Sequence, residues 1–321
     1  MKNLQSPISN IKYIWIAIFA VICSACSDPL KEPVKFSVTM QNNLTMGADS
    51  FYVAPQGTVL QFVFDANADI ITEQHSIFNE ADASLGFVTS LSWADNPGAL
   101  RVLLGTDFPG LSHNNEADKN LVHSYAWTDI TDSCHIPAVK ATSDTTLVNM
   151  SEYADQSVVI AFCYKTEDNS GFQPMFVLRN MLLQSWVRKT GEVIDEQTAP
   201  TMAFTPFDVL LTDSTAYESS DAGGRWDISF SDPADKTAVK IRQSAANRST
   251  NEDWLISRPL AIPRGKQDYS ATLTLKNIHT HAEGYSLKLD EPGEWIVTFR
   301  AFNENYKHHS SAIQTYKFLV K

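Results

Sequence analysis

Residues 295–303 read WIVTFRAFN and residues 313–320 read IQTYKFLV, and these two runs lie near the C-terminal end of the sequence. Both are rich in β-branched and aromatic residues, which favour strands. The turn sequence Glu291-Pro292-Gly293 precedes the first run, and the polar segment 304–310 separates it from the second. We therefore predict a hairpin of two strands joined by a loop.

Strand signals of the same kind dominate the rest of the chain. Short apolar runs such as VLQFVF (59–64), LRVLL (100–104) and VVIAF (158–162) are separated by clusters of Asp, Asn, Ser, Thr, Gly and Pro. Short runs bounded by turn residues are typical of β-sandwiches and barrels. No apolar stripe with helical spacing is longer than about ten residues. The sequence thus predicts an all-β fold.

The closing hairpin is matched by a segment near the other end of the chain. The hairpin resembles the last two strands of PKD-type immunoglobulin-like domains, and residues 58–71 resemble the early strands of the same fold. This resemblance implies one discontinuous sandwich, built from residues 36–75 and 283–321, with residues 76–282 inserted as a second domain. The alternative is two unrelated β segments, with the second domain appended to the sandwich.

The middle of the chain resembles jelly-roll modules called choice-of-anchor J, which are related to MAM domains. The resemblance depends on five motifs: LRVLLGTDF (100–108), WTDITD (127–132), VVIAFCY (158–164), FVLRN (176–180) and NEDWLIS (251–257). In those modules a DWLIS strand usually comes first, whereas here it follows the other motifs. We therefore expect a jelly-roll domain with a permuted strand order.

Both halves together resemble a family of surface lipoproteins, domain-of-unknown-function family 5017, whose members accompany starch-utilisation-type glycan uptake systems. The resemblance implies a polysaccharide ligand and partners among the proteins of such a system. The family commonly has ITFYSGEPG after an early strand, and this chain has IITEQHSI at residues 70–77 instead. No role of that loop is therefore carried over to this chain.

The N-terminal residues have the three regions of a bacterial export signal. Lys2 and Lys12 precede the apolar stretch YIWIAIFAVIC (13–23), and Ser24-Ala25-Cys26 follows. This order is typical of a cleaved signal peptide, and the apolar stretch has about half the length that a membrane-spanning helix needs. Because residues 23–26 resemble a lipobox, we predict a signal peptide at residues 1–25 and lipid attachment at Cys26.

Lipidation would anchor the chain in the bilayer, with the proline-containing segment 26–35 as a tether. The alternatives are lipidation of Cys23 or a cleaved signal without lipid. Ser27 stands where some lipoproteins carry an inner-membrane retention aspartate, and Asp28 and Glu32 resemble a weak copy of a surface-export signal. We expect an outer-membrane protein that is lipid-anchored and faces the cell surface.

The chain is acidic, with a formal net charge of −12. The signal peptide contains Lys2 and Lys12 and no acidic residue, so its removal takes the charge from −12 to −14. An acidic surface repels phosphate groups. The composition therefore excludes nucleic acid as a partner.

The sequence contains no G-x-S-x-G, H-E-x-x-H or P-loop motif, and these are the motifs that would indicate hydrolase or nucleotide chemistry. Cys134 precedes His135, but neighbouring residues of a strand face opposite ways. We predict no enzymatic activity and no cofactor. A structural Ca²⁺ stays open, because Ca²⁺ prefers oxygen ligands and carboxylates are abundant at Asp107, Glu116, Asp118, Asp129 and Asp132.

Two cysteines, Cys134 and Cys163, follow the lipid site. The exported compartment permits a disulfide between them, which would contribute ~3–4 kcal/mol to stability in the chain-entropy model. Cys163 lies in an apolar run, however, where a buried free thiol packs as a small hydrophobic residue. The sequence leaves both interpretations open.

Two tryptophans lie beside turn-forming residues. Trp93 precedes ADNPG (94–98), and Trp226 follows Gly223-Gly224-Arg225. A loop aromatic can stack on a sugar ring while polar neighbours bind its hydroxyls. We predict that Trp93 and Trp226 bind glycan, with plugging of the sandwich rim as the alternative. The tryptophans within strand motifs are expected in the core: Trp127, Trp254 and Trp295.

The function expected from these features is that of a non-catalytic, lipid-anchored surface protein that binds an extracellular ligand. A glycan is the favoured ligand, in association with a polysaccharide uptake system. The alternative function is that of an adhesin or structural surface protein that binds another protein.

Overall fold

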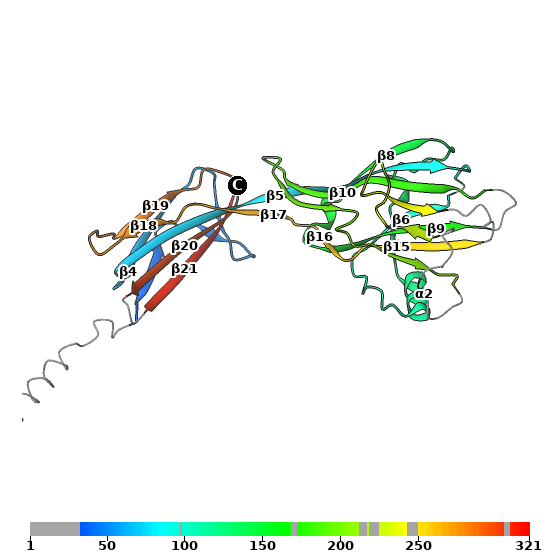
Figure 1. Cartoon of the computed structure of the whole chain (residues 1–321). Helices are drawn as coiled ribbons and strands as arrows, with labels where there is room; N and C mark the ends of the chain where they lie inside the picture. Colours follow the sequence, from blue (N-terminus) through cyan, green and yellow to red (C-terminus); the bar gives the residue numbers. More distant parts are fainter. Residues whose placement is uncertain are drawn as a thin grey trace, which may run out of the picture. The chain divides into compact units, whose positions relative to one another are not determined.

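The computed structural model describes residues 33–96, 98–167, 172–211, 217, 225–242, 250–304 and 309–321. The predicted signal peptide, Cys26 and most of the predicted tether lie outside these residues. In the described part, strands predominate over one α-helix, α2 (Asn115–Ser124), and two 3₁₀ turns, η1 (Thr131–Ser133) and η2 (Ser151–Tyr153) (Figure 1). The predicted all-β class is thus confirmed.

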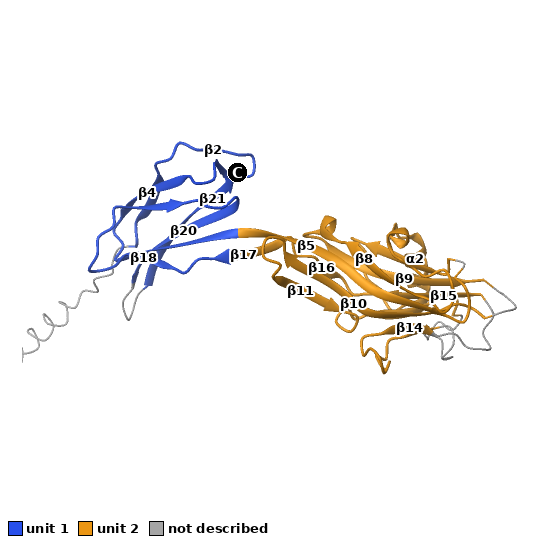
Figure 2. Ribbon diagram, turned by 90° about the horizontal axis from the view of Figure 1, so that it is seen from above, with its two compact units in different colours: residues 1–77, 268–321 blue, residues 78–267 orange. Residues whose placement is uncertain are grey.

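The chain folds into two compact units (Figure 2). The first contains the residues up to Ile77 together with Asp268–Lys321, and the second contains Phe78–Gln267. Strand β5 (Ile70–Ser92) carries the chain from the first unit into the second, and β17 (Gly265–Tyr269) carries it back. Residues 268–282 therefore belong to the first unit. Among the described residues, no helix has the length and apolarity needed to cross a membrane.

The first unit is built from strands of both chain ends. Besides the first part of β5 and the end of β17, its strands are β1 (Phe36–Met40), β2 (Thr45–Met46), β3 (Tyr52–Ala54), β4 (Val59–Ala66), β18 (Leu273–Lys276), β19 (Gly284–Lys288), β20 (Gly293–Glu304) and β21 (His309–Val320). One sheet has the order β1-β4-β19. The other has the order β5-β20-β21-β3-β2, with β18 also paired to β5.

Distant segments share the core of this first unit. Strand β4 alternates, so that Leu60 and Phe62 are buried while Val59 and Gln61 are exposed. The ring of Phe62 packs against that of Phe299 in β20, with 4.8 Å between centroids. A sandwich needs an apolar inner face on each sheet, and here β4 and the closing hairpin supply these faces for each other.

The second unit is also made of two sheets. Besides the end of β5, its strands are β6 (Leu100–Gly105), β7 (Thr128–Asp129), β8 (Ser143–Asn149), β9 (Ser157–Thr166), β10 (Met175–Val187), β11 (Val193–Thr198), β12 (Thr205–Asp208), β13 (Arg225–Asp227), β14 (Val239–Arg242), β15 (Asn251–Ile256) and β16 (Leu260–Ala261). One sheet has the order β13-β14-β10-β5, with β8 on β5 and β11 on β10. The other has the order β12-β15-β9-β6-β7, with β16 on β9.

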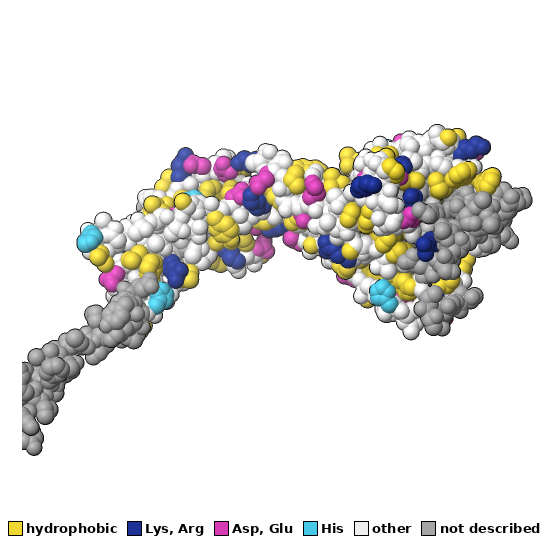
Figure 3. All heavy atoms as spheres, in the orientation of Figure 1, with side chains coloured by type: hydrophobic (Ala, Val, Ile, Leu, Met, Phe, Trp, Pro, Cys, Tyr) yellow, Lys and Arg dark blue, Asp and Glu magenta, His cyan; other side chains and the backbone are white. Residues whose placement is uncertain are grey.

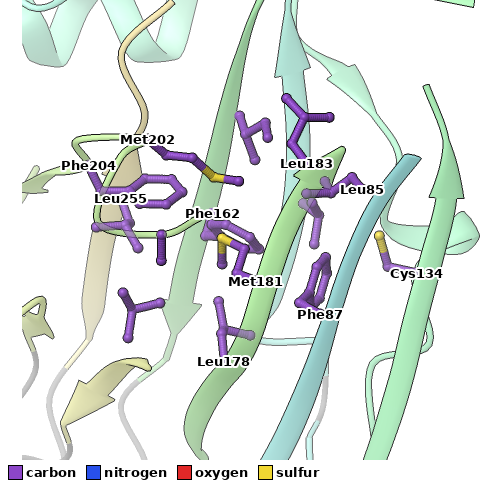
Figure 4. Close-up of a cluster of buried hydrophobic side chains, with 14 of the residues drawn as sticks. Leu85, Phe87, Cys134, Phe162, Leu178, Met181, Leu183, Met202, Phe204 and Leu255 are labelled. Carbon is purple, nitrogen blue, oxygen red and sulfur yellow. The ribbon is translucent and has the colours of Figure 1, made fainter. Parts of the chain in front are cut away.

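Figure 4 shows the core of the second unit, in which side chains from the two sheets point toward one another. Phe87 of β5 meets Phe162 of β9 edge to face, with 5.7 Å between ring centroids. Strand β9 is apolar on both faces. Its other face packs on a second apolar cluster, which explains why the run 158–164 does not alternate between apolar and polar residues.

The helix α2 contributes to that second cluster through Val122. It begins at Asn114, whose side-chain oxygen accepts the N–H of Ala117 at 3.0 Å and caps the helix. Glu116 and Asp118 lie in its first turn, where negative charge is favourable toward the helix dipole. Asp118 is also fixed from outside the helix, since Tyr217 donates a hydrogen bond to it at 2.9 Å.

Candidate functional site

The most exposed aromatic pair in the described residues of the second unit lies where β5 ends and β10 begins. These strands are antiparallel, with Ser92 opposite Met175. Trp93 and Phe172, just beyond the paired ends, therefore meet, with 6.0 Å between ring centroids and a tilted geometry. Trp93 is 59% exposed and Phe172 is 48% exposed. Together they form the end-strand aromatic pair.

The backbone at Trp93 is strained, because its φ of +72° lies in the left-handed region, which is typical of neither strands nor right-handed helices. A left-handed backbone costs a residue with a side chain ~1–2 kcal/mol. Burial does not offset this cost, because most of the indole faces solvent. Strain of this kind is frequently found at binding sites.

The turn after Trp93 is held by hydrogen bonds. The side-chain oxygen of Asn96 accepts the backbone N–H groups of Gly98 and Ala99 at 2.8 and 2.7 Å. Asp95 accepts the backbone N–H of Lys140 at 2.8 Å. These polar neighbours, which we expected to bind ligand hydroxyls, instead order the loop that presents Trp93.

The prediction for Trp226 is wrong. Trp226 lies in β13, is 2% exposed, and donates its indole N–H to the carbonyl oxygen of Asp253 at 3.2 Å. Residues 223 and 224 lie outside the described residues, but β13 already begins at Arg225 and pairs Trp226 with Ile241 of β14. This pairing places the indole in the sandwich core, where no ligand can stack on it.

The other tryptophans named from the sequence pack in the protein interior. Trp254 and Trp295 are buried. Trp127 is partly buried, donates its indole N–H to the carbonyl oxygen of Val122 at 3.0 Å, and lies 5.6 Å from Trp254 between ring centroids. Trp127 thus ties the end of α2 to the sheet below it.

Cys134 and Cys163 are both free and buried, so the disulfide that the sequence allowed does not form. Cys134 packs in the core between the two sheets, whereas Cys163 packs in the cluster on the outer face of β9. A sheet therefore separates the two thiols. Burial raises the pKa of each thiol to about 12, and this keeps both in the unreactive protonated form.

Two carboxylates of the second unit, Glu252 and Asp129, form structural contacts. Glu252 is buried and accepts hydrogen bonds from the indole of Trp254 at 3.1 Å and from Lys165 at 3.1 Å, and His123 lies 2.7 Å from it. Asp129 forms an ion pair with Arg101. Within the described residues, no three His, Cys, Asp or Glu side chains are grouped as a metal site would require.

One aromatic residue that faces solvent was missed from the sequence. Trp186 is half-buried near the end of β10, opposite Asp82 of β5. Because Leu183, Ser185 and Val187 are buried, Trp186 belongs to the outer face of the sheet. The sequence MLLQSWV (181–187) does not alternate between apolar and polar residues, so the outer position of Trp186 could not be predicted from it.

Surface charge on the described residues is mixed. On the face seen in Figure 3, Lys and Arg side chains lie scattered among Asp and Glu, with hydrophobic side chains between them. The strands and the two compact units thus define an all-β protein of two sandwich units.

The chain belongs to the family described as Domain of unknown function (DUF5017), whose family model matches residues 25–204, more than half of the chain. The match includes the first four strands, β5, and the second unit as far as the segment before β12. Comparisons with curated proteins and with solved structures found no match.

Proposed function

We propose that this protein is a non-catalytic lipoprotein of the outer membrane that binds an extracellular glycan through Trp93 and Phe172. The observation that carries the proposal is the exposure of both rings at one end of the second unit. Aromatic faces stack on the apolar face of a sugar ring, and such contacts work at a wet surface because they need no charge.

The backbone strain at Trp93 supports the same proposal. A residue in the left-handed conformation is most stable as glycine, and an exposed indole adds little to folding. A tryptophan at this position is therefore disadvantageous for stability, and ligand binding is a reason for it to be there.

Attachment at the cell surface is the second part of the proposal. It rests on the lipobox-like residues 23–26 and on the resemblance to surface lipoproteins. A lipid anchor with a proline-containing tether would hold the sandwich units near a membrane, and a glycan uptake system is the setting in which such a binder would deliver polysaccharide.

The experiment that tests the ligand is affinity electrophoresis of the full chain against a panel of polysaccharides. We expect retardation of the wild-type protein by at least one glycan, and weaker retardation of Trp93→Gly and Phe172→Ala. Trp93→Gly removes the indole and relieves the strained backbone, so it should unfold at the same or a higher denaturant concentration than the wild type.

The matched control is Tyr269→Ala, which removes an aromatic ring that is 69% exposed in the first unit. This variant should be retarded like the wild type. If no glycan retards the wild-type protein, and it instead binds a protein ligand with an affinity that depends on Trp93, the adhesin alternative replaces the glycan proposal.

A further inference from the structure

A groove lies on the outer face of the sheet in the second unit that contains β5, β8 and β10. It has a volume of about 350 Å³ and is lined by Asp82, Ala83, Ser84, Leu147, Asn149, Ser151 and Trp186. Volumes of this size are within the range of small-molecule sites. The lining combines one large aromatic side chain with hydroxyl, amide and carboxylate groups.

The groove follows from the strand register. On its outer face β5 carries only small side chains at Ser84 and Gly86, whereas its two neighbours carry larger ones. Leu147 of β8 stands opposite Gly86, and Trp186 of β10 stands opposite Asp82. The central strand therefore forms a low floor between two walls, and Leu147, at 72% exposed, shows that the face is uncovered.

The carboxylate of Asp82 is held in a fixed orientation. Arg188 donates to both of its oxygens, with nitrogen–oxygen distances of 2.9–3.2 Å. These hydrogen bonds lower the pKa of Asp82, so that it is ionised at neutral pH. Ser151 also forms a side-chain hydrogen bond with Asp82. The carboxylate is still 32% exposed, so it can accept a hydrogen bond from a sugar hydroxyl.

The local charge restricts the kind of ligand. Arg188 also binds Glu80 at 2.6 Å, so that two carboxylates share one guanidinium and the three groups carry a net negative charge. The side-chain hydroxyl of Ser84 and the side-chain amide nitrogen of Asn149 form no hydrogen bond with another described residue, whereas the amide oxygen of Asn149 accepts the backbone N–H of Ser151. The groove therefore offers neutral donors and an anionic acceptor, which match hydroxyl groups and repel carboxylate or sulfate groups.

We infer that this groove is a second glycan-binding site, independent of the end-strand aromatic pair, which takes a neutral sugar ring stacked on Trp186 with its hydroxyls bonded to Asp82. The inference shares only its ligand class with the proposed function. Both sites lie along β5 in the same unit, so one chain could contact a polysaccharide at two places.

Isothermal titration calorimetry on the full chain in a sugar-free detergent tests the inference. The probes are neutral oligosaccharides of glucose, mannose, galactose or xylose, and oligogalacturonate as the acidic counterpart. We expect Trp186→Ala to weaken binding of a neutral probe about tenfold and Trp186→Phe to retain most of it. Asp82→Asn removes a negative charge from the groove, so its affinities for neutral and acidic probes should differ by less than those of the wild type.

The controls separate this site from the end-strand aromatic pair. Ser84→Leu fills the floor of the groove without removing a core side chain, and it should weaken binding as Trp186→Ala does even if the latter folds poorly. Tyr269→Ala should bind like the wild type. If Trp93→Gly lowers the affinity for the sugar and the groove variants Trp186→Ala and Ser84→Leu do not, the second site is overturned and the proposed function stays intact.

The opposite result, in which only the groove variants lose affinity, supports the groove and overturns the end-strand aromatic pair. Preferential binding of oligogalacturonate by the wild type would overturn the neutral ligand. If the wild type binds none of the sugars, both the groove and the proposed function are wrong.

Discussion

Trp93 and Trp226 have the same side chain and similar sequence surroundings, but their environments differ completely. Both lie next to turn-forming residues, yet Trp93 is 59% and Trp226 is 2% exposed. The difference comes from pairing partners. Trp226 lies within β13, which pairs with β14, and its ring packs near Phe162 of β9. Trp93 instead lies just past the last paired residue of β5.

We predict that Trp226→Ala lowers the free energy of unfolding by ~3–5 kcal/mol, because it leaves a large cavity and removes the hydrogen bond from the indole to the carbonyl oxygen of Asp253. Urea unfolding monitored by circular dichroism measures this change. Tyr269→Ala is the control and should stay within ~0.5 kcal/mol of the wild type. A Trp226→Ala protein as stable as the wild type would contradict the core position.

The thiols of Cys134 and Cys163 provide a second test at the residue scale. Because burial raises both pKa values to about 12, neither thiol should be alkylated by iodoacetamide in the native protein at neutral pH. Both should react fully in urea without any reductant, since no disulfide joins them. Peptide mass mapping reads the two sites separately, and a Cys134–Cys163 cross-linked peptide would contradict the structure.

Among the elements, α2 is held to its sheet by charge as well as by apolar packing. Glu252 of β15 meets His123 from the last turn of α2 and Lys165 of β9. Burial acts to raise the pKa of Glu252, but the hydrogen bonds from His123, Trp254 and Lys165 prevail and lower it below the ordinary 4.5. The ionised carboxylate is thus favoured in the folded state.

A carboxyl group with a lowered pKa in the folded state stabilises the protein above its unfolded pKa, and this contribution is lost as the pH falls through the folded pKa. We therefore predict that Glu252→Gln is destabilised relative to the wild type at neutral pH. The difference should shrink as the pH falls below 4.5 and disappear once the pH lies below the lowered pKa of Glu252. Urea titrations across this range measure it, with Glu167→Gln, an exposed glutamate outside any helix, as control. A difference that persisted in acid would show that charge is not the cause.

Strand β5 illustrates what can be read from sequence at this scale. Its alternation from Ala81 to Leu91 is regular, and the same is true of β4, so the existence of these strands could be predicted. The register could not, because it depends on partners such as β8 and β10 that are remote in sequence. The groove beside Trp186 arises from that register and was therefore missed.

At the scale of the whole molecule, the lipid anchor that we propose would determine where the protein acts. Lipoprotein processing uses the thiol as acyl acceptor, so Cys26→Ala should abolish acylation and release the protein from the membrane fraction or leave it unprocessed. Labelling with a clickable fatty acid measures this outcome. Cys23→Ala is the matched control and should keep its label; if it loses the label instead, the acylation site is Cys23.

The sequence by itself determined the all-β class and the family, because strand periodicity, turn residues and family motifs are local properties that survive without knowledge of the partners. The predicted export signal, which stays a prediction, rests on an equally local pattern. Only the tertiary structure decided which aromatic rings face solvent, on which side of β9 each thiol lies, and how Asp82 comes to face Trp186. Exposure is a property of what packs against a side chain, and in this sandwich those neighbours come from distant strands.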